Sequence, residues 1–397
     1  MRRTSLPFLK INSLINTTPV QKLIAFRNIH FSDIVNTTQV DLISTDGISS
    51  TQDILFEFTN ITFTGVSYSM SGYLMDLNHL LVNQVLIQNS SFTNLTNAGI
   101  RIGGTASNSN VIKSKVKIIN SVFNSSMVGT SSFISTYTKS EVEIINCTFT
   151  NMATVDNGAV LRAMSSEVIV NISDSLFQNN SAIEGSLFNI ESKGVVRCTN
   201  CTIINNFAVT SGIARTDSSG YFEFYSSTIT QNFAVNYIIS VLFDSVNLSV
   251  IDSSEIYENK PMTLSEVINE INNECVNLCF LPDKIKEVVL ESQTYYAEQG
   301  ETPTLFQLVQ ASLMITNASK IHSEDRLINS FLSILIFENS ILYDMAIKDT
   351  SIETIQSTLE FNDMTVYNIT NVQNKPFILA NLDSDFKISN VQYSDSN

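Results

Sequence analysis

Few residues of this chain have the types and spacing that catalysis or metal binding would need. The histidines are His30, His79 and His322, and none of them stands between two glycines. Glu324 and Asp325, the densest acidic group, are typical of a solvated turn. Asp383 and Asp385 offer too few ligands for calcium, which takes about six to eight oxygens. The sequence therefore predicts no catalytic residue, no cofactor and no metal site.

The five cysteines could form disulfides or bind a metal. They are Cys147, Cys198, Cys201, Cys275 and Cys279. Cys198 and Cys201 have the spacing of a redox or zinc half-site. Other copies of the sequence repeat have Ile or Phe at the position of Cys198, so we expect both cysteines to be buried thiols. Cys147 and Cys201 fall two repeats apart, about 9.6 Å, which is beyond the reach of a disulfide. Cys275 and Cys279 are the predicted disulfide.

The triplet Asn-x-Ser/Thr, the acceptor for N-glycosylation, occurs thirteen times. The candidate glycosylation sites are Asn60, Asn89, Asn94, Asn124, Asn146, Asn171, Asn179, Asn200, Asn247, Asn317 and Asn368. Several of these asparagines recur at one place in the repeat, so the triplets follow partly from the fold. Glycosylation is a prediction that requires a secreted chain.

A repeat of about 27 residues positions all of these side chains. Its anchor is a large apolar residue, found at Phe31, Phe63, Phe92, Phe123, Phe149, Phe177, Ile203, Ile229, Ile256, Tyr295, Ile321, Leu342, Val366 and Tyr393. Steps between Phe149 and Ile256 are 28, 26, 26 and 27 residues. Apolar pairs such as Val142 and Ile144 precede the anchor by seven and five residues and alternate with polar residues, as half-buried strands do.

A sharp corner is expected three residues before each anchor. Asn or Asp recurs there, as in Asn89, Asn146 and Asp174. These residues tolerate the left-handed backbone conformation that a corner requires. About ten residues after many anchors a further strand opens with glycine, as at Gly158 and Gly185. Each repeat thus predicts one coil of about three short strands, and stacked coils would share one core.

The fold predicted is an all-β, single-stranded, right-handed parallel β-helix of about fourteen coils. A leucine-rich repeat is the alternative, because Val142, Ile144 and Phe149 also fit its strand signature. The spacer after each anchor carries a glycine-led strand rather than a leucine-patterned helix, which favours the β-helix.

One interruption predicts a helical insertion. Thr263 to Glu266 reads as a helix capping box, followed by apolar residues at helical spacing. We expect this short helix to pack on the rod as a lid rather than to dock a partner. The predicted organisation is a lead-in at 1–21, regular coils at 22–260, the insertion at 261–284 and further coils at 285–397.

Composition limits the possible functions. Charged residues make up 15% of the chain, and the net charge is −16, which disfavours nucleic acid and anionic membrane surfaces as partners. The longest apolar run, Phe331 to Phe337, is far short of the roughly 20 residues that span a bilayer. No secretion signal is visible after Met1. The solenoid is expected to be cut from a longer polypeptide, which could carry a membrane anchor.

Two successive coils carry a recognisable motif. Phe177-Gln-Asn-Asn180 with Gly185-Ser-Leu187, and Ile203-Ile-Asn-Asn206 with Gly212-Ile213, resemble the FxxN and GGA[ILV] repeats of polymorphic outer membrane proteins and of large protist surface proteins. The resemblance covers roughly residues 55–260, with Ile replacing Phe in later coils and one Gly of the GGA triplet. It implies a pectin-lyase-like β-helix exposed at a cell surface, and it supplies no catalytic residues.

Three functions follow as expectations. The first is a non-enzymatic structural or adhesive segment of a larger cell-surface or secreted protein, with a protein or glycan at that surface as its partner. The second is a glycan-binding or polysaccharide-cleaving β-helix, which a lateral face rich in Tyr and carboxylates would favour. The third is an intracellular repeat scaffold like the leucine-rich repeats.

Overall fold

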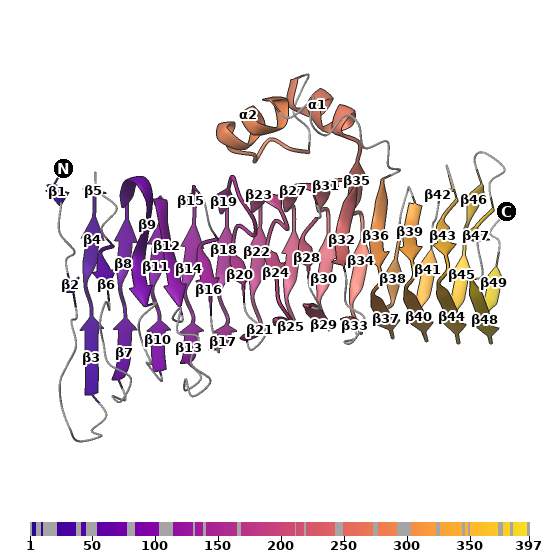
Figure 1. Ribbon diagram of the computed structural model, residues 1–397, viewed down its shortest axis with the longest axis horizontal. Helices are drawn as coiled ribbons and strands as arrows, with labels where there is room; N and C mark the ends of the chain where they lie inside the picture. The colour runs from indigo at the N-terminus through magenta and orange to yellow at the C-terminus, as the bar shows by residue number, and fades with distance from the viewer. Residues whose placement is uncertain are drawn as a thin grey trace.

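The chain forms a parallel β-solenoid, a rod of stacked coils with one helical insertion on its side (Figure 1). The computed structural model describes residues 2–4, 9–10, 22–36, 41–44, 54–77, 84–102, 114–129, 132–137, 140–164, 168–210, 212–217, 220–242, 249–272, 277–291, 303–322, 326–343, 346–347, 350–371, 376–381 and 384–394. The predicted all-β parallel β-helix is thereby confirmed. Strands and not helices follow the anchors, so the leucine-rich repeat is set aside.

Two sheets of thirteen strands each run the length of the rod, and we call them sheet B and sheet C. Sheet B contains β3 (Lys22–Arg27), β7 (Ile54–Thr59), β10 (Gln84–Gln88), β13 (Ser114–Ile119), β17 (Ser140–Ile145), β21 (Val168–Ser173), β25 (Val195–Thr199), β29 (Tyr221–Tyr225), β33 (Ser249–Asp252), β37 (Ser312–Thr316), β40 (Ile334–Glu338), β44 (Thr358–Asn362) and β48 (Asp385–Ser389). Sheet C contains β4 (His30–Ser32), β8 (Thr62–Thr64), β11 (Ser91–Thr93), β14 (Val122–Asn124), β18 (Thr148–Thr150), β22 (Leu176–Gln178), β26 (Thr202–Ile204), β30 (Thr228–Thr230), β34 (Glu255–Tyr257), β38 (Lys320–Ile321), β41 (Ile341–Tyr343), β45 (Thr365–Tyr367) and β49 (Gln392–Ser394).

The third sheet, sheet A, has 21 strands, because many coils contribute two short strands to it. They are β1 (Arg2–Thr4), β2 (Leu9–Lys10), β5 (Ile34–Asn36), β6 (Ile43–Ser44), β9 (Ser67–Leu77), β12 (Thr96–Ile102), β15 (Met127–Val128), β16 (Ile134–Thr136), β19 (Ala153–Thr154), β20 (Leu161–Ala163), β23 (Ser181–Glu184), β24 (Phe188–Ile190), β27 (Phe207–Thr210), β28 (Ala214–Thr216), β31 (Phe233–Val235), β32 (Tyr237–Leu242), β35 (Lys260–Met262), β36 (Thr304–Val309), β39 (Arg326–Phe331), β43 (Ile352–Ile355) and β47 (Ile378–Asn381). A separate pair joins β42 (Ala346–Ile347) to β46 (Thr370–Asn371).

The anchors form a continuous column inside sheet C. Phe123 stacks on Phe149 with ring centroids 4.6 Å apart, and Phe149 stacks on Phe177 at 5.1 Å. Each coil therefore covers the apolar surface of the next, so the core is continuous where no single coil could form one. Thirteen of the predicted anchors lie in this column. Tyr295 lies outside the described residues, and Ile256 pairs directly with Ile321, so no coil stands between them in sheet C.

The corners are left-handed, as the sequence predicts. The φ angle is 50° at Asn89, 51° at Asn146 and 52° at Asp174. Glycine serves the same purpose at the opening of the later strand: Gly212 has a φ of 49°, and a Cβ atom there would lie 1.6 Å from the carbonyl oxygen of Ile238. Only glycine fits this position, because the neighbouring coil approaches too closely.

The insertion contains two helices, α1 (Leu264–Asn272) and α2 (Asp283–Glu291). The predicted capping box is present: the backbone nitrogen of Thr263 donates to Glu266 Oε2 at 2.7 Å, and that of Glu266 donates to Thr263 Oγ1 at 3.2 Å. The insertion extends past residue 284, the limit expected from the sequence, because α2 ends at Glu291. Neither helix of the described chain has the length and apolar character to span a bilayer.

The insertion packs on the outer face of sheet A, which confirms the predicted lid (Figure 1). Leu264 and Val267 of α1, with Ile285 of α2, are buried against an apolar strip on β27, β31 and β35. The strip consists of Phe207, Val209, Phe233, Val235 and Met262. The alanines between these residues point into the rod instead. The helices are thus stable because they cover a face that would otherwise expose large apolar side chains to water.

Candidate functional site

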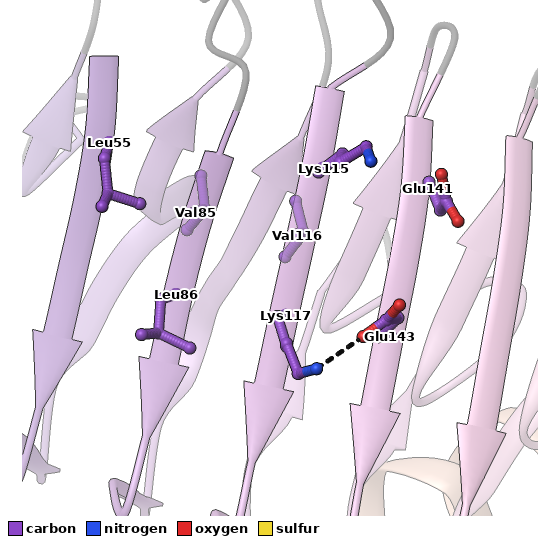
Figure 2. A pocket seen from close by; sticks show the side chains of 8 residues that line it. All are labelled: Leu55, Val85, Leu86, Lys115, Val116, Lys117, Glu141 and Glu143. Atoms are coloured by element: carbon purple, nitrogen blue, oxygen red, sulfur yellow. Dashed lines mark ion pairs between the residues drawn. The ribbon is translucent and has the colours of Figure 1, made fainter. Parts of the chain in front are cut away.

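A shallow groove of about 310 Å³ lies on the outer face of sheet B, across β7, β10, β13 and β17 (Figure 2). Its lining consists of Leu55, Val85, Leu86, Lys115, Val116, Lys117, Glu141 and Glu143. Apolar side chains from β7 and β10 occupy one end, and lysines and glutamates from β13 and β17 occupy the other. The volume is at the lower limit of small-ligand pockets.

Two of the four charged residues of the groove, Lys117 and Glu143, belong to one outward row of sheet B. Glu57, Leu86, Lys117 and Glu143 occupy successive places in this row. Lys117 Nζ lies 2.9 Å from Glu143 Oε2, and both side chains are exposed, so the pair contributes about 0–1 kcal/mol to stability. No histidine, cysteine or serine lines the groove. It could hold a small, partly apolar ligand, but its lining residues offer no hydroxyl, thiol or imidazole group.

A second polar cluster lies on sheet A near the amino-terminal end. Arg101 on β12 pairs with Asp76 on β9: its Nε donates to Oδ1 at 2.8 Å, and its Nη2 donates to Oδ2. The guanidinium carbon lies 4.4 Å from the centre of the Tyr73 ring. The backbone nitrogen of Tyr73 donates to Asp41 Oδ1 at 2.9 Å. Tyr137, which follows β16, lies close enough to Tyr73 and Arg101 for both to influence its pKa.

Burial shifts two titratable groups of this cluster. It raises the pKa of Asp41 to about 6, and it raises the pKa of Tyr137 to about 12. The nearby Asp76 carboxylate also raises the pKa of Asp41, whereas the backbone nitrogen of Tyr73 and the Arg101 guanidinium lower it. Because Asp76 is itself paired with Arg101, the cluster is a partly buried charge network that joins successive coils.

The cysteines of the repeat are buried thiols, as predicted. Cys147, Cys198 and Cys201 are buried and form no disulfide. Burial raises the pKa of Cys147 to about 11 and also raises that of Cys198, so both stay protonated and unreactive at neutral pH. In the described part of the chain, no group of three or more His, Cys, Asp or Glu side chains could hold a metal ion. Cys279 is exposed and Cys275 lies outside the described residues, so their disulfide remains a prediction.

The candidate glycosylation sites divide by exposure. The exposed ones are Asn60, Asn89, Asn94, Asn146, Asn200 and Asn317; the half-buried ones are Asn124, Asn171, Asn179 and Asn368; Asn247 lies outside the described residues. Corner asparagines form an outer ladder, in which Asn146 Nδ2 donates to Asn120 Oδ1 at 2.9 Å. That nitrogen is the atom that would carry the glycan. Glycosylation at this corner would therefore compete with the ladder.

The remaining sequence candidates do not come together. His30 is exposed on sheet C, and His322 is half-buried near the opposite end of the rod. His79, Glu324, Asp325 and Asp383 lie outside the described residues. Sequence reasoning does not predict the cluster around Arg101, because its members come from separate coils with loops of unequal length.

Comparison with known proteins adds no family: no protein-family model, no curated protein and no solved structure matches this chain.

Proposed function

We propose that this chain is a non-enzymatic structural and interaction segment of a larger cell-surface or secreted protein. The observation that supports it most is the unbroken parallel pairing of thirteen strands in sheet B. Each coil is held to the next by backbone hydrogen bonds and by a shared core, so the rod holds its length without a partner. Such a rod suits a spacer that presents binding surfaces on its lateral faces.

The cell-surface part of the proposal rests on the resemblance of the Phe177 and Ile203 coils to the repeats of polymorphic outer membrane proteins. On the same basis we assign the rod to the pectin-lyase-like β-helices. The polar composition agrees with this setting, because the chain is rich in Ser, Thr and Asn, only 15% of its residues are charged, and its net charge is −16. The partner would be a protein or a glycan at the surface, and no cofactor is needed.

Three measurements test the proposal. Small-angle X-ray scattering of the purified chain should give the profile of an elongated rod of constant cross-section. Expression of a tagged full reading frame in its own cells should place the tag at the surface, where protease added to intact cells removes it. Incubation with polygalacturonate and neutral polysaccharides should release no reducing ends, whereas sustained cleavage would overturn the non-enzymatic assignment. A cytosolic, protease-protected tag would overturn the location.

A further inference from the structure

The middle outward row of sheet B has an order of residues that is complementary to its own reverse. The row takes one residue from each coil, and in register it reads Ala25, Glu57, Leu86, Lys117, Glu143, Asn171, Arg197, Glu223, Val250, Met314, Ile336, Glu360 and Lys387. We call the stretch from Leu86 to Val250 the central row. Its residues lie on successive strands from β10 to β33, and each side chain is half-buried or exposed.

Two ion pairs within the rod occupy most of the central row. Lys117 Nζ lies 2.9 Å from Glu143 Oε2, and Arg197 Nε lies 2.8 Å from Glu223 Oε2. In both pairs the cation comes first along the rod, and the uncharged Asn171 separates the pairs. Cross-strand pairing accounts for opposite charges on neighbouring strands. It does not require the two pairs to have the same order.

This common order makes the central row complementary to a second copy that runs in the opposite direction. When two copies face each other about Asn171, every charged residue of the central row meets a residue of opposite charge. The opposed residues, from the centre outward, are Glu143 with Arg197, Lys117 with Glu223, and Leu86 with Val250. Each contact occurs twice, so the copies are joined by ion pairs near the centre and by apolar contacts at both ends.

Asn171 lies on the two-fold axis of such a pair and faces its own copy. Its amide has both donors and an acceptor, so two copies of it can hydrogen-bond to each other. Two copies that run in the same direction would instead place Lys117 opposite Lys117 and Glu143 opposite Glu143. The charges therefore favour opposite directions and disfavour the same direction.

The shape of sheet B supports the same arrangement. The groove of about 310 Å³ lies across β7 to β17, on one side of Asn171 (Figure 2). On the other side, β29 carries Tyr221, Glu223 and Tyr225, which alternate with buried residues and point outward. Reversal about Asn171 places β29 of one copy over β13 of the other, inside the groove. Lys115, which lines the groove, then faces the ring of Tyr221, as in a cation–π contact.

We propose that this rod forms a homodimer, in which two copies pack side by side in opposite directions through the outer faces of sheet B. The contact covers seven coils at about 4.8 Å each and about five residues along each strand at about 3.3 Å, which is on the order of 500 Å² of each copy. This area is at the lower limit of specific interfaces. The dimer should therefore be weak, with a dissociation constant in the micromolar range, and high salt should weaken it further. The proposal is independent of where the rod acts.

The first test measures association of the full chain, produced in bacteria because a glycan on Asn171 would separate the copies. Sedimentation velocity over a range of concentrations should show a reversible equilibrium between monomer and dimer. Small-angle X-ray scattering of the dimer should show a thicker rod that is only about two coils longer than the monomer, because the reversal is centred on the sixth of thirteen coils. A dimer of doubled length, or a chain that stays monomeric at every concentration, would overturn the proposal.

Two charge reversals test which residues meet. Glu143→Arg places two cations opposite each other in the dimer, and Arg197→Glu places two anions opposite each other, so each variant alone should dimerise about tenfold or more weakly. An equimolar mixture of the two variants should recover dimers, because the new cation of one variant faces the new anion of the other. Each reversal also breaks an ion pair within the rod, which mixing cannot restore. Recovery on mixing therefore reports contact between the copies.

Lys387→Glu is the matched control, because it breaks an ion pair with Glu360 within the rod but lies outside the proposed contact. It should leave the dissociation constant unchanged. Asn171→Asp breaks no ion pair and places two carboxylates on the axis, so it should weaken the dimer even where a charge reversal prevents folding, which circular dichroism checks. Unchanged association in the folded variants, equal loss in Lys387→Glu, or no recovery on mixing two folded reversals would overturn the proposal.

Discussion

Asn206 Nδ2 donates a hydrogen bond of 2.9 Å to Asn232 Oδ1, although the two residues belong to successive coils and are fully buried. The same bond joins Asn180 to Asn206 at 2.9 Å and Asn232 to Asn259 at 2.8 Å. These side chains form an inner ladder, three residues after the anchor, in which each amide also binds backbone groups. Asn206 Nδ2 lies 3.1 Å from the carbonyl oxygen of Phe177, and its Oδ1 accepts from the backbone nitrogen of Asn180. The ladder thereby satisfies polar groups that the corner leaves without a strand partner.

Asn206→Ala should destabilise the rod strongly. The change leaves the backbone nitrogen of Asn180 and the amides of both neighbouring asparagines short of partners inside the rod, and each buried unsatisfied group costs roughly 1–3 kcal/mol. We expect a loss of about 3 kcal/mol or more in the free energy of unfolding, measured by urea denaturation. Thr202→Ala, an exposed change in the same coil, should stay within about 0.5 kcal/mol. Equal effects of the two changes would contradict the ladder argument.

Gly212→Ala should also be disruptive. Its Cβ would lie 1.6 Å from the carbonyl oxygen of Ile238, and its φ of 49° is unfavourable for alanine. The backbone of the next coil must move to make room. We therefore expect the free energy of unfolding, measured by thermal or urea unfolding, to fall by roughly 3 kcal/mol or more. Gly194→Ala is the matched control, because its new Cβ would meet its nearest neighbours at 3.3 Å. A smaller effect at Gly212 than at Gly194 would show that the coils can separate locally.

Sequence alone predicts the parts of this structure that repeat. Phe149 and Asn146 are found because burial and left-handed backbone recur at fixed steps, and the same physics applies in every coil. The limit of the insertion is not predicted correctly: α2 continues to Glu291, past the predicted limit at residue 284, because the repeat spacing does not mark where an inserted segment ends. The cluster at Arg101 depends on contacts between coils, which spacing along the chain does not encode.

A row of outward aromatic residues on sheet C, which includes Tyr343 and Tyr367, could have been read from the sequence, because these residues directly follow the anchors Leu342 and Val366. Its signal is a change of residue type along one outward column rather than a pattern within one coil. Searches for catalytic spacing miss it, because its members lie about one repeat apart and acquire a common face only after the coils stack.

The stability of the chain should depend on pH through Asp41. Burial raises its pKa to about 6 in the folded chain, compared with 3.8 as the ordinary value. The folded chain thus binds the proton of Asp41 more tightly than the unfolded chain does. The free energy of unfolding therefore has its full value, as far as Asp41 is concerned, below about pH 4, and it decreases as the pH rises to about 6. Because Asp41 is partly solvated, the loss should be on the order of 1 kcal/mol.

Asp41→Asn keeps an acceptor for the backbone nitrogen of Tyr73 and removes the titration. Urea unfolding at several pH values should show that the variant lacks this decrease, so that its stability relative to the unmodified chain increases from about pH 4 to about pH 6. Glu258→Gln, at an exposed corner, is the control and should leave the pH profile unchanged. A constant difference between Asp41→Asn and the unmodified chain at all pH values would contradict the raised pKa.

Val267→Asp should detach the helical insertion while the rod remains folded. Val267 is fully buried between α1 and the apolar strip of sheet A, so a carboxylate there would be placed against Phe233 and its neighbours without a partner. Detachment of the insertion costs less free energy than unfolding of the rod, because the core of the coils does not include the insertion. We expect increased binding of a dye specific for exposed apolar surface and faster proteolysis within 263–303, with the β-sheet circular dichroism signal retained. The control Ser265→Asp, on the exposed side of α1, should show neither change. Loss of the β-sheet circular dichroism signal in Val267→Asp would mean that the rod itself requires the insertion.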